Sequence, residues 1–359
     1  MAFEQKLHMK QGQGETSYAR NSFVQNEGQK RMKPLIEAAI ADLCPGTTLL
    51  PTKMVIADLG CSSGPNAVAL VSTAVEAIHN HCHQFSQPPP EVSVLLNDLP
   101  DNDFNLVVKS LVTLRRSSSE PPIVMAGVLP GSFYERLFTS GSLHLVFSSN
   151  SLHWLSKAPD ELTRNQIPAY DIDEHTMLER RPMVLQAYAQ QFRKDFTRFL
   201  ELRAEEMIQG GRMVVSLVIR DSDVITPDYS HLCEFVAQIL SVMVSEGVID
   251  KAKFDSFHLP VYEPSEKQLR EIIQDEGSFS ITEMQVTDPF VDLDSALVVP
   301  SRFSKVIRAA FEPIIVLHFG EVMDEFVKTL EHHWSFVCSL QDEHAKSPRL
   351  MAILSLKKA

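Results

Sequence analysis

The chain has 359 residues, of which 44% are hydrophobic and 22% charged, a composition typical of globular proteins. Its formal net charge of −13 argues against nucleic-acid binding, because such binding needs a basic surface to meet phosphates. No apolar stretch approaches the ~20 residues of a membrane span, the N-terminal residues lack the apolar core of a signal peptide, and five scattered cysteines without C-x-x-C spacing predict reduced thiols in the cytoplasm.

A flexible leader and one helix are predicted before the first strand. Residues 1–30 are polar, and their propensities predict a flexible segment. Residues 32–43 place apolar side chains at helical spacing. The run Cys44-Pro45-Gly46 predicts the end of that helix, because neither proline nor glycine continues a helix well.

The stretch V-I-A-D-L-G-C-S-S-G-P-N at 55–66 predicts a strand, a glycine turn and a helix. Its first three residues form an apolar run typical of a buried parallel strand, and Asp58 ends that run. Gly60 and Gly64 permit a sharp turn, and Pro65 suits the first turn of a helix. This geometry brings a nucleotide against the backbone N–H groups at a helix N-terminus.

The spacing of these glycines excludes two nucleotide motifs. The pattern is D-x-G-x-x-x-G, and neither G-x-G-x-x-G nor G-K-[ST] is present. An acid at the end of the strand repels a pyrophosphate but attracts a cation. S-adenosylmethionine carries an α-ammonium and a sulfonium and has no phosphate, so it fits this pattern. The alternative at this point is an ordinary strand-to-helix turn.

Strands and helices alternate along the rest of the chain. Further strands are predicted at 92–96, 123–127, 143–148, 213–219, 279–286 and 350–356, and helices at 67–78, 182–209, 232–243 and 311–340. Gly210-Gly211 is predicted to end the helix at 182–209. The alternation predicts an α/β protein with an open sheet and helices on both of its faces.

The polar segments predict a cap over the carboxyl ends of the strands, where ligands bind in such sheets. We therefore predict a single unit over residues 1–359. Its core comprises about 50–156, 182–220, 271–286 and 311–359. Its helical cap and lid comprise about 1–49, 157–181, 221–270 and 287–310.

Polar residues follow the predicted strands. Asp98-Leu99 ends the second strand, where an acid commonly binds a ribose diol, although an isolated acid there is more often a solvated turn residue. Ser132-Phe133 follows the third strand and suits an adenine, through a hydrogen bond and an aromatic face. The run H-N-H-C-H at 79–83 has no second ligand cluster at an obvious spacing, which favours a solvated helix end over a zinc site.

The sequence contains no G-x-S-x-G elbow and no Ser/His/Asp order of an acyl-transfer enzyme. Methyl transfer to a carboxylate requires no such machinery. A carboxylic acid has a pKa of about 4 and is already ionised at pH 7. The reaction then depends on alignment and desolvation.

Five motifs occur in order and together resemble the plant SABATH family of S-adenosylmethionine-dependent methyltransferases. They are L-H-M-K-x-G-x-G-E-x-S-Y-A-x-N-S at 7–22, A-D-L-G-C-S-S-G-P-N at 57–66, N-D-L-P-x-N-D-F-N at 97–105, P-G-S-F-Y-x-R-L-F at 130–138 and S-L-H-W-L-S at 151–156. The family includes salicylate, benzoate, jasmonate and indole-3-acetate carboxyl methyltransferases and xanthine N-methyltransferases. The resemblance extends from Leu7 to Leu356. It implies a Rossmann-like S-adenosylmethionine-dependent methyltransferase core with a mostly helical cap, S-adenosylhomocysteine as by-product, and a homodimer.

The resemblance also implies the residues of the methyl-donor site. By motif, the donor contacts Tyr18, Cys61, Asn66, Asp98, Leu99, Ser132 and Phe133, with Lys10, Ser22, Asp58 and Gly60 nearby. The polar leader then becomes a lid over the donor. Gln25 and Trp154 match the pair that hydrogen-bonds the substrate carboxylate. An amide and an indole N–H are neutral donors that orient a carboxylate without the strong pairing of an arginine.

The pocket residues implied by the family are more varied. Candidate substrate contacts are Gln25, Asn150, His153, Trp154, Cys233, Ile307, Ala310 and either Arg349 or Leu350. Cys233 falls where a tryptophan often narrows the cavity, so a larger cavity than one built for bare benzoate is expected. His153 has an ordinary pKa near 6.5 but is expected to shape the pocket rather than act as a base, because the carboxylate has no proton to lose.

Some family members also carry a magnesium ion near the cap. Its positions correspond here to Asn165, Asp255, Phe257 and His258, with His258 in place of the usual asparagine. Magnesium prefers oxygen ligands in octahedral geometry. The alternative is that these residues only build the cap.

The leading hypothesis is a carboxyl O-methyltransferase that forms the methyl ester of a small plant acid by direct displacement. Benzoate or salicylate ranks ahead of jasmonate or indole-3-acetate. A xanthine-type N-methyltransferase is the alternative with the same fold, although those members usually replace the histidine of L-H-W. A catalytically silent ligand-binding protein and an NAD-dependent oxidoreductase stay as alternatives, and the missing third glycine argues against the latter.

Overall fold

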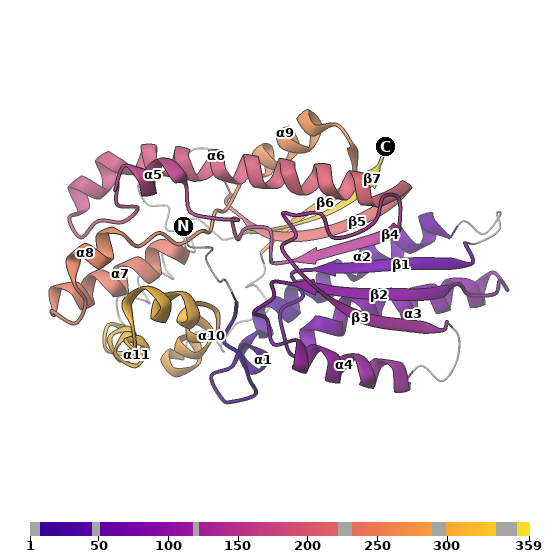
Figure 1. Ribbon diagram of the computed structural model, residues 1–359, viewed down its shortest axis with the longest axis horizontal. Coiled ribbons are helices and arrows are strands. Elements are labelled where there is room, and N and C mark those ends of the chain that lie inside the picture. The colour runs from indigo at the N-terminus through magenta and orange to yellow at the C-terminus, as the bar shows by residue number, and fades with distance from the viewer. Residues whose placement is uncertain (1–7, 45–50, 118–121, 222–231, 289–298, 335–349) are drawn as a thin grey trace.

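The computed structural model describes residues 8–44, 51–117, 122–221, 232–288, 299–334 and 350–359. Its described residues form one seven-stranded sheet with helices on both faces, beside a second group of helices (Figure 1). This arrangement confirms the predicted α/β fold with a mostly helical cap. Among these residues, none of the helices combines the length and apolar composition that crossing a bilayer requires.

The sheet has the strand order β3-β2-β1-β4-β5-β7-β6. Its strands are β1 (Lys53–Leu59), β2 (Glu91–Asp98), β3 (Val124–Pro130), β4 (Leu143–Ser149), β5 (Met207–Ile219), β6 (Phe279–Thr287) and β7 (Leu350–Lys358). The first five strands run parallel, whereas β7 is antiparallel to both β5 and β6. Because β1 and β4 are neighbours at the middle of the sheet, the chain order reverses there, and such switch points bind ligands.

Each face of the sheet is covered by its own helices because the strand residues alternate between two hydrophobic clusters. One face packs against α2 (Phe23–Leu43), α3 (Ala69–Gln84) and α4 (Phe104–Ser117). The other packs against α6 (Glu174–Glu206) and α9 (Glu266–Glu276). Strands buried on both faces require continuous apolar runs, which explains why β1 and β4 are recognisable in the sequence.

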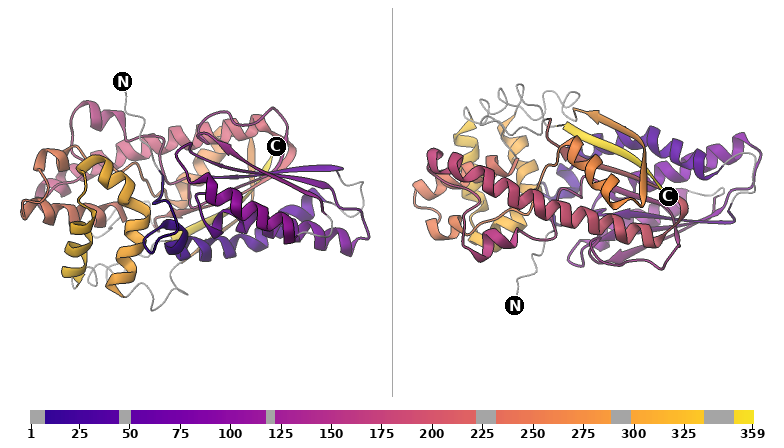
Figure 2. Two further views of the ribbon diagram at one scale, coloured as in Figure 1. Left: turned by 60° about the horizontal axis from the view of Figure 1, so that its bottom comes forward. Right: turned by 90° about the horizontal axis from the view of Figure 1, so that it is seen from above.

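The second group of helices has its own hydrophobic cluster. It contains α7 (Leu232–Ser245), α8 (Lys251–Asp255), α10 (Pro300–Phe319) and α11 (Met323–His332). Three short helices complete the described chain, namely α1 (Tyr18–Asn21), η1 (Pro65–Val68) and α5 (Asp160–Arg164). The long helix α6 runs beside both the cap and the sheet (Figure 2).

Two helix boundaries on the sheet side differ from the prediction. α2 begins at Phe23 rather than at residue 32, because its polar first turns lie against other segments: Asn26 donates to Asn66, and Gly28 lies against Asn150 and Met351. α3 continues to Gln84 and absorbs most of the predicted histidine-rich loop. His81 Nε2 contacts the carbonyl oxygen of Cys44, so the helix end is fixed by a tertiary contact.

The prediction for α6 is wrong at both ends. The helix begins at Glu174, since Asp173 caps it by accepting a 2.8 Å hydrogen bond from the N–H of Thr176. It ends at Glu206, before the Gly210-Gly211 pair. These glycines belong to β5, where Gly210 has a φ of +73° and the pairing with β4 is irregular. The glycine pair therefore forms a bulge in a strand and does not cap the helix.

The predicted helix at 311–340 is two helices in the structure. α10 runs from Pro300 to Phe319 and is followed by Gly320, whose φ of +90° a residue with a side chain rarely adopts. The sequence assigned residues 311–359 to the core, but α10 and α11 pack in the cap cluster. Residues 335–349, including Arg349, lie outside the described part of the chain.

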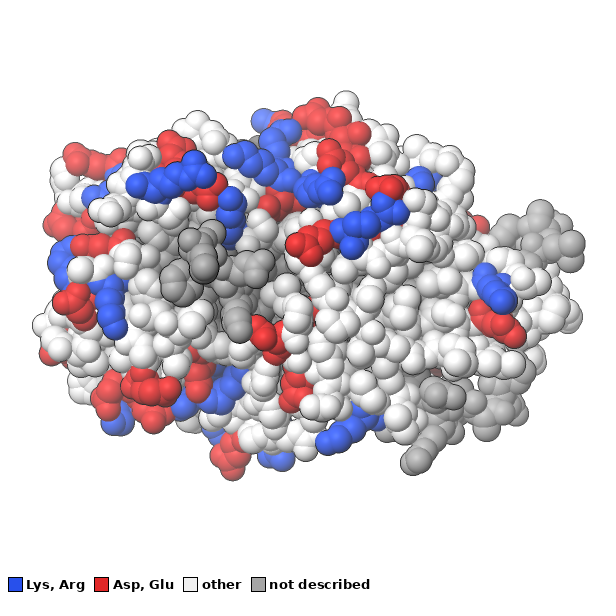
Figure 3. All heavy atoms as spheres, in the orientation of Figure 1, with Lys and Arg blue, Asp and Glu red and all other residues white. Residues whose placement is uncertain are grey.

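Charged side chains are mixed on the face of the molecule shown in Figure 3. Acidic and basic residues alternate there without a broad region of positive charge among the described residues.

A buried ion pair attaches the loop after β3 to the end of α6. Arg203 Nε lies 2.8 Å from Glu206 Oε2, and both side chains are fully buried. The guanidinium donates to the carbonyl oxygens of Phe133 and Glu135 at 3.1 Å. Glu206 accepts the N–H of Leu137 at 2.7 Å. This pair thus holds the segment that the sequence analysis assigned to the adenine.

We predict that Glu206→Ala lowers the free energy of unfolding by about 3–5 kcal/mol, because it leaves the guanidinium of Arg203 buried without its counter-charge. Denaturant unfolding of the purified chain measures this loss. Glu201→Ala is the matched control, since Glu201 is an exposed partner of Arg198 on the same helix and should change stability by about 1 kcal/mol or less. Equal losses in the two variants would contradict the assigned role of the buried pair.

Candidate functional site

The glycine turn after β1 presents bare backbone to the carboxyl edge of the sheet. Gly60 and Gly64 have φ of +77° and +92°. A Cβ on Gly60 would overlap the side chain of Ser151 and lie 3.3 Å from the ring of Phe133. A Cβ on Gly64 would lie 2.7 Å from the Cα of Ala19. Both glycines are therefore required by close neighbours as well as by backbone conformation.

Asp98 lies directly beneath this turn at the end of β2. Its Oδ2 accepts the N–H of Ser62 at 2.6 Å, and its Oδ1 accepts the N–H of Leu99 at 2.7 Å. The N–H groups of Gly60 and Cys61 both donate to the carbonyl oxygen of Asn97 at 2.9 Å. The structure thus brings the ends of β1 and β2 together, as expected for neighbouring parallel strands.

Two carboxyl groups, that of the buried Asp58 and that of the half-buried Asp98, lie within electrostatic reach of each other at this point. Burial, together with the charge of Asp98, raises the pKa of Asp58 to about 7. Burial raises the pKa of Asp98 to about 6, although the two backbone N–H groups oppose this rise. The pKa of Tyr18 is also raised, by burial and by Asp98. The site therefore favours a positively charged ligand, which would stabilise both carboxylates.

The N-terminal segment covers the turn. The N–H of Lys10 donates to the carbonyl oxygen of Ala309 in α10 at 2.9 Å, and the N–H of Tyr18 donates to the carbonyl oxygen of Lys10 at 2.9 Å. Lys10 Nζ forms an ion pair with Glu312. The prediction of a flexible leader is therefore wrong for residues 8–30. The segment around Lys10 contacts the cap, and residues 23–30 belong to α2.

Asn66 connects this covering segment to η1. Its Nδ2 donates to the carbonyl oxygen of Ser22 at 2.8 Å and to the hydroxyl of Ser22 at 3.0 Å. Its Oδ1 accepts from Asn26 Nδ2 at 3.0 Å. The structure thus brings Tyr18, Ser22 and Asn66 to the glycine turn, where the family resemblance expects them.

The loop after β3 lies on the other side of the turn. Asn97 Nδ2 donates to the carbonyl oxygens of Leu129 and Gly131, at 2.8 and 2.9 Å. The ring of Phe133 stands at Gly60, and Ser132 Oγ accepts the N–H of Tyr134 at 3.2 Å. These contacts hold Ser132 and Phe133 at the edge of the turn.

Three polar side chains near the end of β4 have unsatisfied hydrogen-bonding groups. Gln25 Oε1 and His153 Nδ1 are buried and have no hydrogen-bond partner among the described residues. Within the same part of the chain, the indole N–H of Trp154 has no acceptor, while its ring lies 5.8 Å from that of Phe311 and 6.0 Å from that of His153. Buried polar groups normally find partners, so Gln25 Oε1 and His153 Nδ1 indicate a ligand site, to which the half-buried Trp154 adds an N–H donor.

His153 is neutral at physiological pH. Burial lowers its pKa to about 4, and the nearby charge of Glu263 only partly opposes this shift. The ordinary pKa near 6.5 that the sequence analysis used is therefore wrong for this side chain. Asn150, in the left-handed conformation with a φ of +53°, carries its amide toward Gly28 of α2.

The remaining predicted pocket residues fall in two places. Cys233 and Ile307 are buried in the cap cluster, and Ala310 and Trp154 pack against that cluster. Leu350 instead begins β7 beside Ile219 and packs on the sheet.

The four predicted magnesium positions do not fit that ion. Asp255 is bound through both oxygens to Lys251 Nζ at 2.7 Å. Both ring nitrogens of His258 face backbone carbonyl oxygens, those of Ser256 at 3.0 Å and of Ile167 at 2.9 Å. Asn165 is exposed and Phe257 is buried in the cap. The side chains available are not the convergent oxygen donors that magnesium prefers, and no cluster of His, Cys, Asp and Glu suited to a metal occurs among the described residues.

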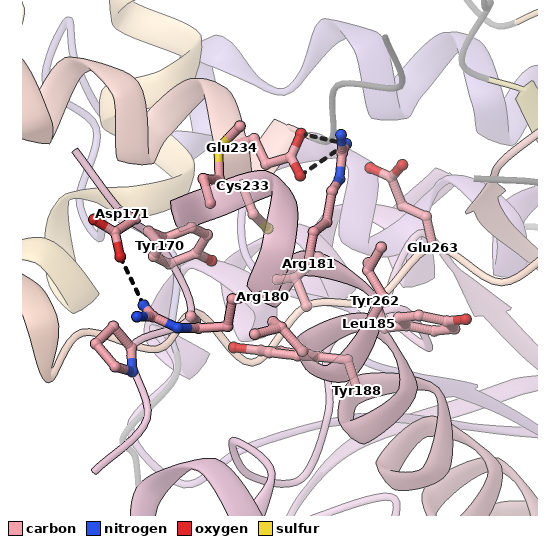
Figure 4. Close-up of a pocket in the computed structure, with 15 residues that line it drawn as sticks. Tyr170, Asp171, Arg180, Arg181, Leu185, Tyr188, Cys233, Glu234, Tyr262 and Glu263 are labelled. Atoms are coloured by element: carbon pink, nitrogen blue, oxygen red, sulfur yellow. Dashed lines mark hydrogen bonds and ion pairs between the residues drawn. The ribbon is translucent and has the colours of Figure 1, made fainter. Parts of the chain in front are cut away.

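A cavity that the sequence did not reveal lies between α6 and α7, and Figure 4 shows its lining. We call it the α6–α7 cavity. It is lined by residues 168–171, by Met177, Arg180, Arg181, Val184, Leu185 and Tyr188 of α6, by Cys233 and Glu234 of α7, and by residues 261–263. Only Cys233 was predicted. The two consecutive arginines before Pro182 could have indicated a polar site in the sequence. The acid that pairs with Arg181, Glu234, could not be identified there because it is 53 residues away.

We predict that Gly64→Ala displaces the covering segment. Alanine in this backbone conformation costs about 1–3 kcal/mol, and overlap with Ala19 adds about as much. Gly320→Ala is a matched control, because Gly320 has nearly the same φ and ψ, +90° and −164° against +92° and −162°, but open space around it. Thermal unfolding and limited proteolysis at residues 8–22 report both effects. Equal stability loss and equal proteolysis in the two variants would contradict the packing of Ala19 on Gly64.

Comparison with known proteins identifies the family to which the chain belongs. The family model described as SAM dependent carboxyl methyltransferase matches residues 4–359. Jasmonate O-methyltransferase of Arabidopsis thaliana is 39% identical over 89% of this chain and 90% of its own length. Inactive anthranilate O-methyltransferase 1 of Zea mays is 36% identical over 100% of this chain and 98% of its own length. The structure of loganic acid methyltransferase with SAH has a TM-score of 0.81 and 29% identity, and the match covers 98% of both chains. The chain therefore belongs to the S-adenosylmethionine-dependent carboxyl methyltransferases, as its motifs predict.

Proposed function

We propose that this chain transfers a methyl group from S-adenosylmethionine to the carboxylate of a small aromatic or fatty plant acid, with benzoate or salicylate ranked ahead of jasmonate or indole-3-acetate. The observation that carries the proposal is that Gln25 and His153 each bury a polar atom without a partner among the described residues, and that the indole N–H of Trp154, next to His153, also lacks one there. The amide N–H groups of Gln25 and the indole N–H are neutral donors from which a carboxylate accepts. A neutral clamp suits an anion that must stay nucleophilic.

The donor site in this proposal is built around Asp58 and Asp98. Asp58 meets the α-ammonium, and Asp98 accepts the ribose hydroxyl groups. The turn at Gly60, with Cys61, Leu99 and Asn66, supplies backbone and amide contacts, while Ser132 and Phe133 hold the adenine. Tyr18 and Ser22 close the site, and Lys10 acts indirectly, since its ammonium is paired with Glu312. S-adenosylmethionine, when bound, supplies the methyl group on a positively charged sulfur.

The acceptor site needs to orient the acid and exclude water. The carboxylate is ionised above pH ~5 and gives up no proton. Gln25 and Trp154 hold its two oxygens, and the neutral His153 shapes the pocket. Cys233, Ile307 and Ala310 form the cap side, and Asn150 and Leu350 the sheet side. Because burial lowers the pKa of His153 to about 4, this imidazole is a weak base at pH 7.

Two further proposals concern the state of the protein. We propose a homodimer, which the exposed side chains of Ile123 and Met125 beside and on the edge strand β3 support. We propose the cytoplasm as its compartment, which the free, buried cysteines Cys44, Cys61, Cys82 and Cys233 support.

We predict that S-adenosylhomocysteine binds about tenfold more weakly at pH 6 than at pH 8. The ammonium binds to the ionised form of Asp58, whose pKa is about 7 in the free protein, so binding at low pH must release a proton. Calorimetry in buffers of different ionisation enthalpy counts that proton. Asp58→Asn should bind more weakly and almost independently of pH, whereas an unchanged pH profile in this variant would remove Asp58 from the donor site.

The same raised pKa values have a consequence for the ligand-free protein. The folded chain binds more protons than the unfolded chain between pH ~4 and 7, because an unfolded aspartate has a pKa of about 4. The stability contribution of Asp58 and Asp98 therefore falls as pH rises through this window. Bound S-adenosylhomocysteine should raise the melting temperature more at pH 8 than at pH 6.

We predict that Trp154→Phe lowers kcat/KM about 10–100-fold on every acid accepted, because it removes one hydrogen bond to a charged group. Affinity for S-adenosylhomocysteine should stay the same. His153→Met should instead keep kcat on the best acid within about tenfold and change the ranking of acids. A uniform loss of 10²–10⁴-fold in His153→Met would identify a general base and contradict this proposal.

A further inference from the structure

The α6–α7 cavity is next to the acceptor site. Trp154 and Val261 form an isolated antiparallel bridge, and the N–H of Tyr262 donates to the carbonyl oxygen of His153 at 2.9 Å. Opposed residues of such a bridge project to the same side. Trp154 therefore shares its side with Val261, which lines the cavity, and both belong with Cys233 to the cap cluster. Val261 therefore connects Trp154, the proposed carboxylate contact, with the lining of the cavity.

A buried ion pair crosses the cavity. Arg181 Nη2 lies 3.0 Å from Glu234 Oε1 and donates to Oε2 at 3.1 Å. The exposed fractions of the two side chains are 8% and 20%. Figure 4 shows the two groups facing each other across the opening, with Cys233 beside them. Since α6 and α7 are far apart in sequence, only the folded chain makes this pair.

The charges of the cavity favour a particular kind of ligand group. Of its described lining residues, two are arginines and three are acids, a formal net charge of −1. Arg180 is bound to Asp171 at 2.7 Å and Arg181 to Glu234, and the third acid of the lining, Glu263, is buried. A second carboxylate on the ligand would have to lose its water beside these acids. A hydroxyl, amino or ring N–H group would instead donate to an acidic oxygen.

Resting on the proposed function, we propose that the Arg181–Glu234 pair is a specificity determinant that selects acids with a neutral hydrogen-bond donor at the end opposite the methylated carboxylate. Tyr170 and Tyr188 line the same cavity, and their pKa values are raised by burial, so both phenols stay protonated. Because the Cys233 side chain is small, it leaves room in the cavity for the donor group of the acid. The pair acts on recognition of the acceptor and takes no part in the methyl transfer itself.

The test uses the full chain and a series of ring acids: benzoate, hydroxybenzoates, aminobenzoates and benzenedicarboxylates. Both kcat/KM for methyl transfer and Kd for binding to the S-adenosylhomocysteine complex are measured. The unmodified chain should favour the best hydroxybenzoate or aminobenzoate about tenfold over benzoate, and by more over any benzenedicarboxylate. The reason is that an analogue without the polar group leaves the hydrogen-bonding groups of the site unpaired.

The double variant Arg181→Met with Glu234→Leu removes the pair together and should abolish this preference while benzoate is still bound. Glu234→Gln keeps the shape of the side chain and removes its charge, and it should weaken the preference. This variant tests the inference if the double variant does not fold. Arg193→Met is the matched control, because Arg193 pairs with Asp275 on the exposed side of α6. It should keep the ranking of the unmodified chain.

The outcomes separate this inference from the proposed function. An unchanged ranking in the folded double variant, or in Glu234→Gln, would overturn the inference and leave the proposed function standing. A preference for dicarboxylates in the unmodified chain would also overturn it. If no acid is methylated but the expected Kd ranking is present and lost in the variants, the inference stands and the proposed catalytic function fails.

Discussion

The arrangement of the site depends on two carboxyl groups beneath one glycine turn, one of them buried and the other half-buried. Asp58 and Asp98 end neighbouring parallel strands, so the sheet brings them together. Burial raises both pKa values, and the backbone N–H groups of Ser62 and Leu99 satisfy only Asp98. A ligand with a positive charge relieves this unfavourable state, whereas a pyrophosphate would worsen it. The electrostatics of the site thus already favour the donor of a carboxyl methyltransferase.

The cover over this turn depends on contacts between distant parts of the chain. The segment with Lys10 and Tyr18 is bonded to α10 of the cap and approaches Gly64 through Ala19. The helix α6 continues from the sheet into the cap, and Arg203 with Glu206 fixes the loop after β3 to its end. The proposed donor site and the α6–α7 cavity are therefore supported by the same helix. This gives the chain a way to keep the reacting groups aligned and away from water.

The local features of this protein could be predicted from its sequence. Strands buried on both faces are continuous apolar runs, and the acid and glycines after β1 have a physical reason at each position. The segment 8–30 could not be predicted, because its polar residues gain their order from α10 and from the glycine turn. Gly210 was misassigned because a glycine with positive φ serves a helix end and a strand bulge equally well. Gly320, in contrast, was a visible break in the helix predicted over 311–340. The Arg181–Glu234 pair requires two helices to meet in space.

The most direct test of the account is the fate of the methyl group. The purified chain is incubated with S-adenosylmethionine that carries a deuterated methyl group, together with small carboxylic acids and, separately, xanthines, and the products are identified by mass spectrometry. We expect a methyl ester that contains the intact deuterated methyl group and no methylated xanthine. Labelled N-methyl products, or a folded chain that binds S-adenosylhomocysteine but forms no labelled ester from any acid, would contradict the account.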